Sequence, residues 1–256
     1  MTQGTYRHGH FVWHELMTPD GAGAEKFYGD LLGWKFRHTE IGGGRIYRLI
    51  DVNGREQGGI LEMPVSEGIP SHWVGYVSVP DVDSAAKVAE AKGGRATCAP
   101  MDIPNIGRFA YLLDPEGAGF VVYHDNRGDQ APREMPNIGD FCWDSLTTTN
   151  GDRALAFYGA VVGWVRGKFG DAPGLFFAAG EGQDVIADTD APQDGARSSW
   201  TTHVVVQNLD NARAKAESLG AKILAPQIDV PTVGKMCIIA DPWGSVISLF
   251  EPQMAA

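Results

Sequence analysis

The chain has 256 residues, of which 43% are hydrophobic and 21% charged, a composition typical of a soluble globular protein with about two domains. Its net charge of −11 argues against nucleic acid and anionic membranes as partners, because neither attracts an acidic surface. No run of about eighteen apolar residues or signal-peptide stretch occurs, and the three cysteines are too scattered for a disulfide framework. We therefore expect a reduced, cytoplasmic protein.

The first half contains one pattern of elements twice. Residues 10–17 alternate as a strand does, and residues 20–33 have helical spacing between Asp20 and a terminal Gly33. Short strands are then expected over 34–39, 45–51 and 57–63. The same order recurs as a strand over 72–79, a helix over 82–92 and strands over 95–101, 108–113 and 118–124. Each part is thus a strand, a helix and three strands.

The second half of the chain repeats the first. Phe27-Tyr28 and Gly33-Trp34 return as Phe157-Tyr158 and Gly163-Trp164, at an offset of 130 residues. Further on, Asp114-Pro115 with Gly117 returns as Asp241-Pro242 with Gly244, at an offset of 127. We therefore predict two copies of one domain. They span 5–126 and 137–253, and a Pro- and charge-rich linker over 127–136 joins them.

Four motifs occur in the same order in this pattern. They are Thr18-Pro19-Asp20, Phe27-Tyr28 followed by Leu32-Gly33-Trp34, Val79-Pro80-Asp81-Val82-Asp83, and Asp114-Pro115-Glu116-Gly117. With them the chain resembles the vicinal oxygen chelate superfamily of glyoxalases, bleomycin-resistance proteins and extradiol dioxygenases, and within it a two-domain glyoxalase-like subgroup. The resemblance implies an α+β fold of four tandem βαβββ modules that form two open eight-stranded glyoxalase-like barrels.

The resemblance also implies a divalent metal held by His, Glu or Gln from the first, fourth, fifth and eighth strands. These ligand positions of the first, fifth and eighth strands fall on Trp13, Val74 and Val121 in the first copy, and on Trp143, Thr201 and Ser248 in the second. None of these six residues is a credible ligand, and Glu62 near the fourth-strand position does not make a site alone. We therefore expect no metal cofactor.

If the strands had a register other than the one that the repeat indicates, a metal site would remain possible. A site built from His14, His72 and His124 could bind Zn, Ni, Mn or Fe. By strand alternation, however, His14 and His124 point to the face opposite the ligand positions, and His72 lies two residues upstream of one.

The same alternation predicts the lining of two pockets. The first copy supplies Trp13, Glu15, Met17, Tyr47, Val74, Tyr76, Ser78, Val121 and Tyr123, and the second supplies Trp143, Ser145, Thr147, Thr201, His203, Val205, Ser248 and Phe250. Aromatic walls with a few polar groups are typical of a site for a small organic molecule.

Two of these residues are candidate catalytic groups. Desolvation beside Trp13 would raise the pKa of Glu15 and make it a base, and His203 could act as a general acid or base. Each has an alternative interpretation as a hydrogen-bonded wall residue. The copies differ at these positions, since Ser145 replaces Glu15 and Tyr76 replaces His203, so we expect unequal pockets and favour the first.

These observations favour a metal-independent protein that holds an aromatic or planar small-molecule ligand. The alternatives are a metal-dependent lyase, isomerase or dioxygenase, and an accessory partner of a biosynthetic monooxygenase. We expect a monomer or homodimer, because fused copies can satisfy within one chain the pairing of single-domain relatives.

Overall fold

The structure is a computed structural model that describes residues 4–64, 69–131, 135–192 and 197–253. Its helices are α1 (Gly21–Leu32), α2 (Val82–Ala91), α3 (Gly151–Val162) and α4 (Leu209–Ser218). The strands of the first copy are β1 (Phe11–Thr18), β2 (Lys35–Glu40), β3 (Ile46–Val52), β4 (Arg55–Glu62), β5 (His72–Ser78), β6 (Arg95–Ala96), β7 (Met101–Ile103), β8 (Gly107–Leu113) and β9 (Gly119–Asp125). Those of the second are β10 (Phe141–Thr147), β11 (Val165–Gly167), β12 (Phe176–Ala178), β13 (Val185–Asp190), β14 (Ser199–Val205), β15 (Lys222–Val230), β16 (Gly234–Ala240) and β17 (Val246–Pro252).

The predicted α+β fold with four βαβββ modules is confirmed. One predicted element differs, because the strand expected over 95–101 is divided into the short strands β6 and β7. Pro100 lies in the gap between them and has no backbone N–H to donate to a neighbouring strand.

Each helix begins after an Asp or Asn that caps it. The side chain of Asp20 accepts a hydrogen bond from the backbone N–H of Gly23, and Asn150 does the same for Arg153 at the start of α3. Helices α1 and α3 end at Gly33 and Gly163, which adopt left-handed backbone conformations with φ of 72° and 82°. These glycines redirect the chain into the next strand.

The strands form two mixed sheets, one from each copy. The first has the order β2-β3-β4-β1-β5-β9-β8-β6, with β7 also paired to β8, and the second has the order β11-β12-β13-β10-β14-β17-β16-β15. Strands β1 and β4 are parallel, as are β5 and β9, and the second sheet repeats this arrangement. The two parallel pairs of each sheet carry most of the predicted site residues.

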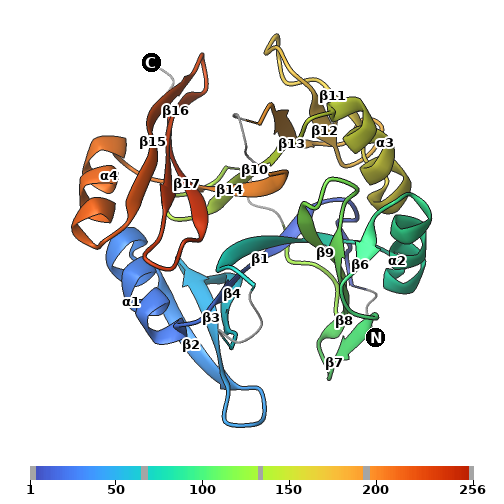
Figure 1. Ribbon diagram of the computed structural model, residues 1–256, viewed down its shortest axis with the longest axis horizontal. Coiled ribbons are helices and arrows are strands. Elements are labelled where there is room, and N and C mark those ends of the chain that lie inside the picture. Colours follow the sequence, from blue (N-terminus) through green and yellow to red (C-terminus); the bar gives the residue numbers. More distant parts are fainter. Residues whose placement is uncertain (1–3, 65–68, 132–134, 193–196, 254–256) are drawn as a thin grey trace. The chain divides into compact units, whose positions relative to one another are not determined.

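Packing divides the chain into two compact units that each combine parts of both copies. Unit 1 contains residues 1–13, 74–132 and 144–200, and unit 2 contains residues 14–73, 133–143 and 201–256. Helices α2 and α3 therefore lie side by side in unit 1, and α1 and α4 in unit 2 (Figure 1). The domain boundaries predicted from the repeat stay a prediction.

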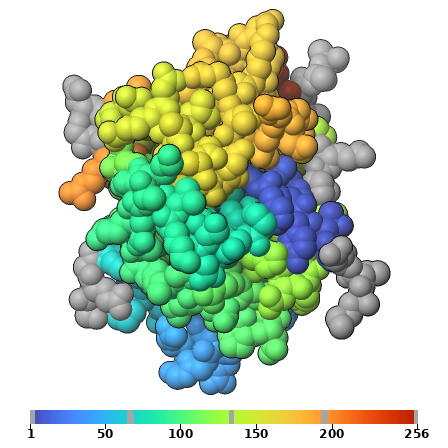
Figure 2. Space-filling view, turned by 90° about the vertical axis from the view of Figure 1, so that its right-hand side faces the viewer, coloured from blue at the N-terminus to red at the C-terminus, as the bar shows by residue number. Residues whose placement is uncertain are grey.

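The core of unit 1 lies beneath α2 and α3. Ala86 and Ala89 of α2 and Phe157 and Tyr158 of α3 are buried in one cluster with the strand residues Val77, Phe120 and Leu146. Burial of this apolar surface stabilises the pairing of the two helices. Their exposed sides, green for α2 and yellow for α3, lie next to each other in Figure 2.

Unit 2 has an equivalent core beneath α1 and α4. Phe27 and Tyr28 of α1 and Leu209 and Ala216 of α4 are buried with Leu16, Ile60, Ile239 and Leu249. No helix in the described part of the chain is long and apolar enough to cross a membrane.

Candidate functional site

Each sheet has a face turned away from the helices, which we call its inner face. On β1, Leu16 is fully buried in the helix-side core, so its neighbour Glu15 belongs to the inner face. On β14 and β17, Val204 and Leu249 are in that core, so His203 and Ser248 belong to the inner face of the second sheet. The alternation used to predict the pocket linings is thus observed on these strands.

In unit 1, aromatic residues of the first copy pack together on the inner face. Tyr76 and Tyr123 meet edge to face, with ring centroids 5.9 Å apart, and pack with Val74 and Val121. These four side chains are 0–9% exposed, and the partly buried Trp13 packs against them. The cluster is therefore a rigid apolar wall, and Trp13 is its partly accessible member.

Two details of this wall were not predicted. The hydroxyl of Tyr123 donates to Asp125 Oδ2 at 2.9 Å, and burial together with this carboxylate raises the pKa of Tyr123. Val12 and Trp13 are consecutive, yet both pack against the cluster.

In unit 2, the first copy places a carboxyl group and a phenol in contact. The hydroxyl of Tyr47 on β3 donates to Glu15 Oε2 at 2.8 Å, and Glu15 is only 5% exposed. Gly59 lies opposite Glu15 in the register of β1 and β4, and a Cβ atom at Gly59 would overlap the Tyr47 hydroxyl. Gly59 therefore leaves the space through which Tyr47 reaches Glu15, and sequence reasoning missed this role.

The second copy places His203 and Ser248 directly opposite each other in unit 2. They are paired in the parallel register of β14 and β17, and they are 5% and 0% exposed. The equivalent pair in the first copy is Tyr76 and Val121, which packs without polar contacts between them. Thr201 and Trp143, the other predicted residues of this unit, are only partly buried.

A carboxylate of the second copy was missed by sequence reasoning. Ser145 pairs in register with Asp188 on β13, and its hydroxyl donates to Asp188 Oδ1 at 2.5 Å within unit 1. In the first copy the same strand position holds Glu15 opposite Gly59. Each copy thus has a carboxylate that accepts a hydrogen bond from a hydroxyl at this strand pair. The carboxylate is Glu15 on β1 in the first copy and Asp188 on β13 in the second. An acidic residue on the partner strand was the signal that could have revealed it.

Burial leaves His203 with a low affinity for protons. Desolvation lowers the pKa of its imidazole from 6.5 to about 4, so the ring is neutral at pH 7. A neutral imidazole can both donate and accept a hydrogen bond.

The pKa of His203 predicts a pH dependence of stability. Between pH 6.5 and about 4, His203 binds a proton in the unfolded chain but not in the folded chain. The free energy of unfolding therefore decreases as the pH falls through this range. The loss should reach about 2 kcal/mol at pH 5. We expect the His203→Gln variant to lose less stability than the parent between pH 7 and pH 5, measured by urea unfolding. Equal losses of stability in the parent and the variant would contradict the lowered pKa of His203.

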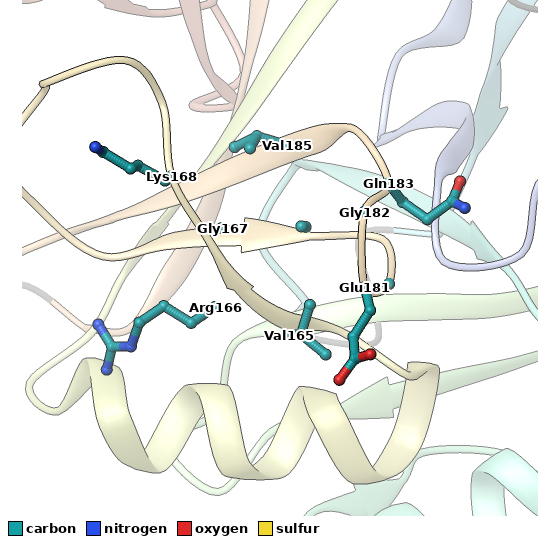
Figure 3. A pocket seen from close by; sticks show the side chains of 10 residues that line it. Val165, Arg166, Gly167, Lys168, Glu181, Gly182, Gln183 and Val185 are labelled. Atoms are coloured by element: carbon teal, nitrogen blue, oxygen red, sulfur yellow. The ribbon is translucent and has the colours of Figure 1, made fainter.

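A shallow pocket of about 400 Å³ lies elsewhere in unit 1, at β11 and the turn from Gly180 to Gln183 (Figure 3). Its two cationic side chains are already paired, Arg166 with Asp152 and Lys168 with Asp171. No aromatic ring lines it, so it does not match the pockets predicted from the sequence.

Comparison with known proteins places the chain in a family. Residues 7–122 match the family model of the Glyoxalase/Bleomycin resistance protein/Dioxygenase superfamily. The protein named "Putative glyoxylase CFP32" of Mycobacterium bovis is 33% identical over 96% of each chain. The chain belongs to this superfamily. The resemblance inferred from its motifs is confirmed.

Two further proteins are similar to almost the whole chain. The "Anthracycline biosynthesis protein DauV" of a Streptomyces species is 27% identical over 95% of this chain and 94% of its own. The crystal structure of the Mn(II)-bound glyoxalase from Novosphingobium aromaticivorans superposes with a TM-score of 0.63 at 13% identity, covering 96% of this chain and 82% of that one. The latter likeness concerns the fold alone.

The residues of this superfamily member do not fit a bound divalent metal. Val74 and Val121 are buried in the apolar wall, and Trp13 packs against it. Glu62 accepts a hydrogen bond from the backbone N–H of Gly21 and lies 3.7 Å from Arg48, so it is engaged at the start of α1. Within the described ranges, no three His, Cys, Asp or Glu side chains are grouped so that they could hold a metal ion.

The three histidines of the alternative metal site each have another partner. His14 stacks on Phe141 with ring centroids 4.3 Å apart, and His72 Nδ1 lies 2.8 Å from the carbonyl oxygen of Pro70. His124 Nδ1 lies 3.0 Å from the carbonyl oxygen of Val79, and its ring stacks on Tyr6. His14 thus points to the core side of β1, as strand alternation predicts.

Proposed function

We propose that this member of the glyoxalase superfamily binds an aromatic or planar metabolite on its inner faces without a metal ion. The observation that carries the proposal is the nature of the residues at the family's ligand positions. Trp13 offers a partly accessible apolar ring, the buried Val74 and Val121 form the packed wall behind it, and none of the three is a metal ligand. Such a surface binds a flat apolar ring better than it binds an ion.

The partly exposed tryptophans would supply the contact with the ring. Trp13 in the first copy and Trp143 in the second are partly buried strand residues at equivalent positions. Tyr76 and Tyr123 would support Trp13 from behind. In the second copy, Ser145 would add a polar contact in unit 1, and Thr201 and Ser248 would do so in unit 2.

Two groups could act on an oxygen of the bound molecule. Glu15 already shares a hydrogen bond with Tyr47, so a proton could pass between this pair and an oxygen of the ligand. His203 is neutral at pH 7 and, with a pKa of about 4, is a weak base, so its role would be a hydrogen bond to a ligand hydroxyl. These roles extend the binding proposal and do not require a metal.

The relative named for anthracycline biosynthesis supports the proposed ligand class. Anthracyclines are polycyclic aromatic compounds, and that relative covers 95% of this chain. A flat polycyclic ligand is therefore the first class to test.

Metal analysis tests the metal-independent part of the proposal. Protein purified without chelator should contain well under one equivalent of Zn, Ni, Mn or Fe, and adding a chelator should leave its melting temperature unchanged. A stoichiometric metal whose removal lowers the melting temperature would overturn the proposal and favour a lyase, isomerase or dioxygenase.

A further inference from the structure

The hydroxyl of Ser248 is a buried polar group without a partner. Ser248 is 0% exposed, and its Oγ atom has no hydrogen-bond partner among the described residues. A buried hydroxyl in this condition costs about 1–3 kcal/mol of stability relative to one that is bonded. Such groups are uncommon in folded proteins and call for a specific explanation.

Comparison of the two copies shows that this cost is not imposed by the fold. The equivalent cross-strand pair of the first copy is Tyr76 and Val121, which is buried, and the valine at the position of Ser248 has no polar side-chain atom. In the second copy both members are replaced, and the pair becomes His203 and Ser248. The position of Ser248 therefore accepts an apolar side chain in this fold, and the buried hydroxyl is specific to the second copy.

The surroundings of the pair restrict what it can recognise. His203 is neutral at pH 7, so the pair presents no fixed charge to attract an anion. The helix-side neighbours Val204 and Leu249 are fully buried, so the backbone that carries the pair is held firmly. The hydroxyl of Ser248 can donate to or accept from an uncharged oxygen, and the neutral imidazole beside it adds no charge to the site.

We infer that His203 and Ser248 form a polar subsite for an uncharged oxygen, a hydroxyl or carbonyl, on the ring of the ligand. This inference rests on the proposed binding of an aromatic metabolite and narrows it to an oxygenated ring. The oxygen supplies the missing partner of Ser248, and a ring without such an oxygen leaves that hydroxyl unpaired.

Two probes that differ by one hydroxyl test the subsite. Naphthalene and 2-naphthol are titrated into the full chain while the ring signal of His203 is followed by NMR, assigned by its loss in the His203→Phe variant. This signal reports binding at the second copy alone. We expect 2-naphthol to bind about tenfold more tightly than naphthalene, the effect of one well-placed hydrogen bond.

The Ser248→Ala variant should reduce that preference threefold or more and leave the affinity for naphthalene unchanged. Because it removes an unpaired buried hydroxyl, it should also raise the melting temperature of the free protein by about 2 °C. The matched control is Thr202→Val, because Thr202 is the next residue on β14, is 4% exposed and also has a buried hydroxyl without a partner in the described chain. That variant should keep the full preference for 2-naphthol.

The outcomes separate the subsite from the proposed function. If the preference for 2-naphthol is equal in Ser248→Ala and Thr202→Val, or if Ser248→Ala lowers the melting temperature, the subsite is wrong. If the probes stabilise the protein but do not shift the His203 signal, the subsite is wrong and aromatic binding stands. If neither probe binds the parent protein anywhere, the proposed function fails and the subsite fails with it.

Discussion

Replacing Tyr28 by Phe should lower the free energy of unfolding by about 2–4 kcal/mol. The Tyr28 hydroxyl is fully buried, donates to Asp241 Oδ2 at 3.0 Å and accepts from Trp73 Nε1 at 2.9 Å. Its removal leaves a buried carboxylate short of one donor and a buried indole without its acceptor, and each loss costs about 1–3 kcal/mol. Urea unfolding at pH 7 measures the change.

The repeat provides a second copy of the same network for comparison. In unit 1, Tyr158 donates to Asp114 Oδ2 at 3.1 Å and accepts from Trp200 Nε1 at 2.9 Å, so Tyr158→Phe should cost a similar amount. Tyr6→Phe removes a half-buried hydroxyl that donates to the backbone oxygen of Asp125 and should cost about 1 kcal/mol or less. Equal small losses in all three variants would show that the buried networks contribute little.

Replacing Trp13 by Ala should weaken binding of a planar aromatic ligand by roughly 1–3 kcal/mol, and Trp143→Ala should weaken it less. Trp13 packs against the wall of Tyr76 and Tyr123, so its ring is held in place before a ligand arrives. Tryptophan-fluorescence titration of both variants with 1,4-dihydroxyanthraquinone measures the difference.

The two tryptophans occupy equivalent positions on β1 and β10, so each variant is the matched control of the other. Similar melting temperatures of the two variants would establish that a change in affinity is local. A larger loss at Trp143, or equal losses, would refute the expected dominance of the first copy and place the main ligand contact in the second.

The sequence predicted the modules well because their signals are local. Asp20 and Gly33 mark the ends of α1 by a side-chain cap and a left-handed glycine, and both act within a few residues of themselves. The repeat then showed the same signals a second time, in the second copy. What the pattern could not predict is how the modules pair, because that depends on faces that meet only after folding: α2 packs on α3 of the other copy, and α1 on α4.

For the candidate site, the sequence predicted which side chains share one face of a sheet but not which of them make contact. Alternation placed Glu15 and Tyr47 in one group, and the structure brings them into a hydrogen bond. Alternation did not reveal Asp188, because in the second copy the carboxylate is on β13 and not on the first strand. Only the register of β10 and β13 shows that Asp188 lies opposite Ser145. The role of Gly59 was equally hidden, since an absent side chain gives no pattern to read.

The most direct test of metal-independent binding is one calorimetric titration of 1,4-dihydroxyanthraquinone into the full chain, run in excess chelator and again with added Mn(II). We expect the same affinity and stoichiometry in both, because the proposed contact is made by the ring of Trp13 and no metal ligands are grouped among the described residues. Binding that is lost in chelator and restored by Mn(II) would contradict it.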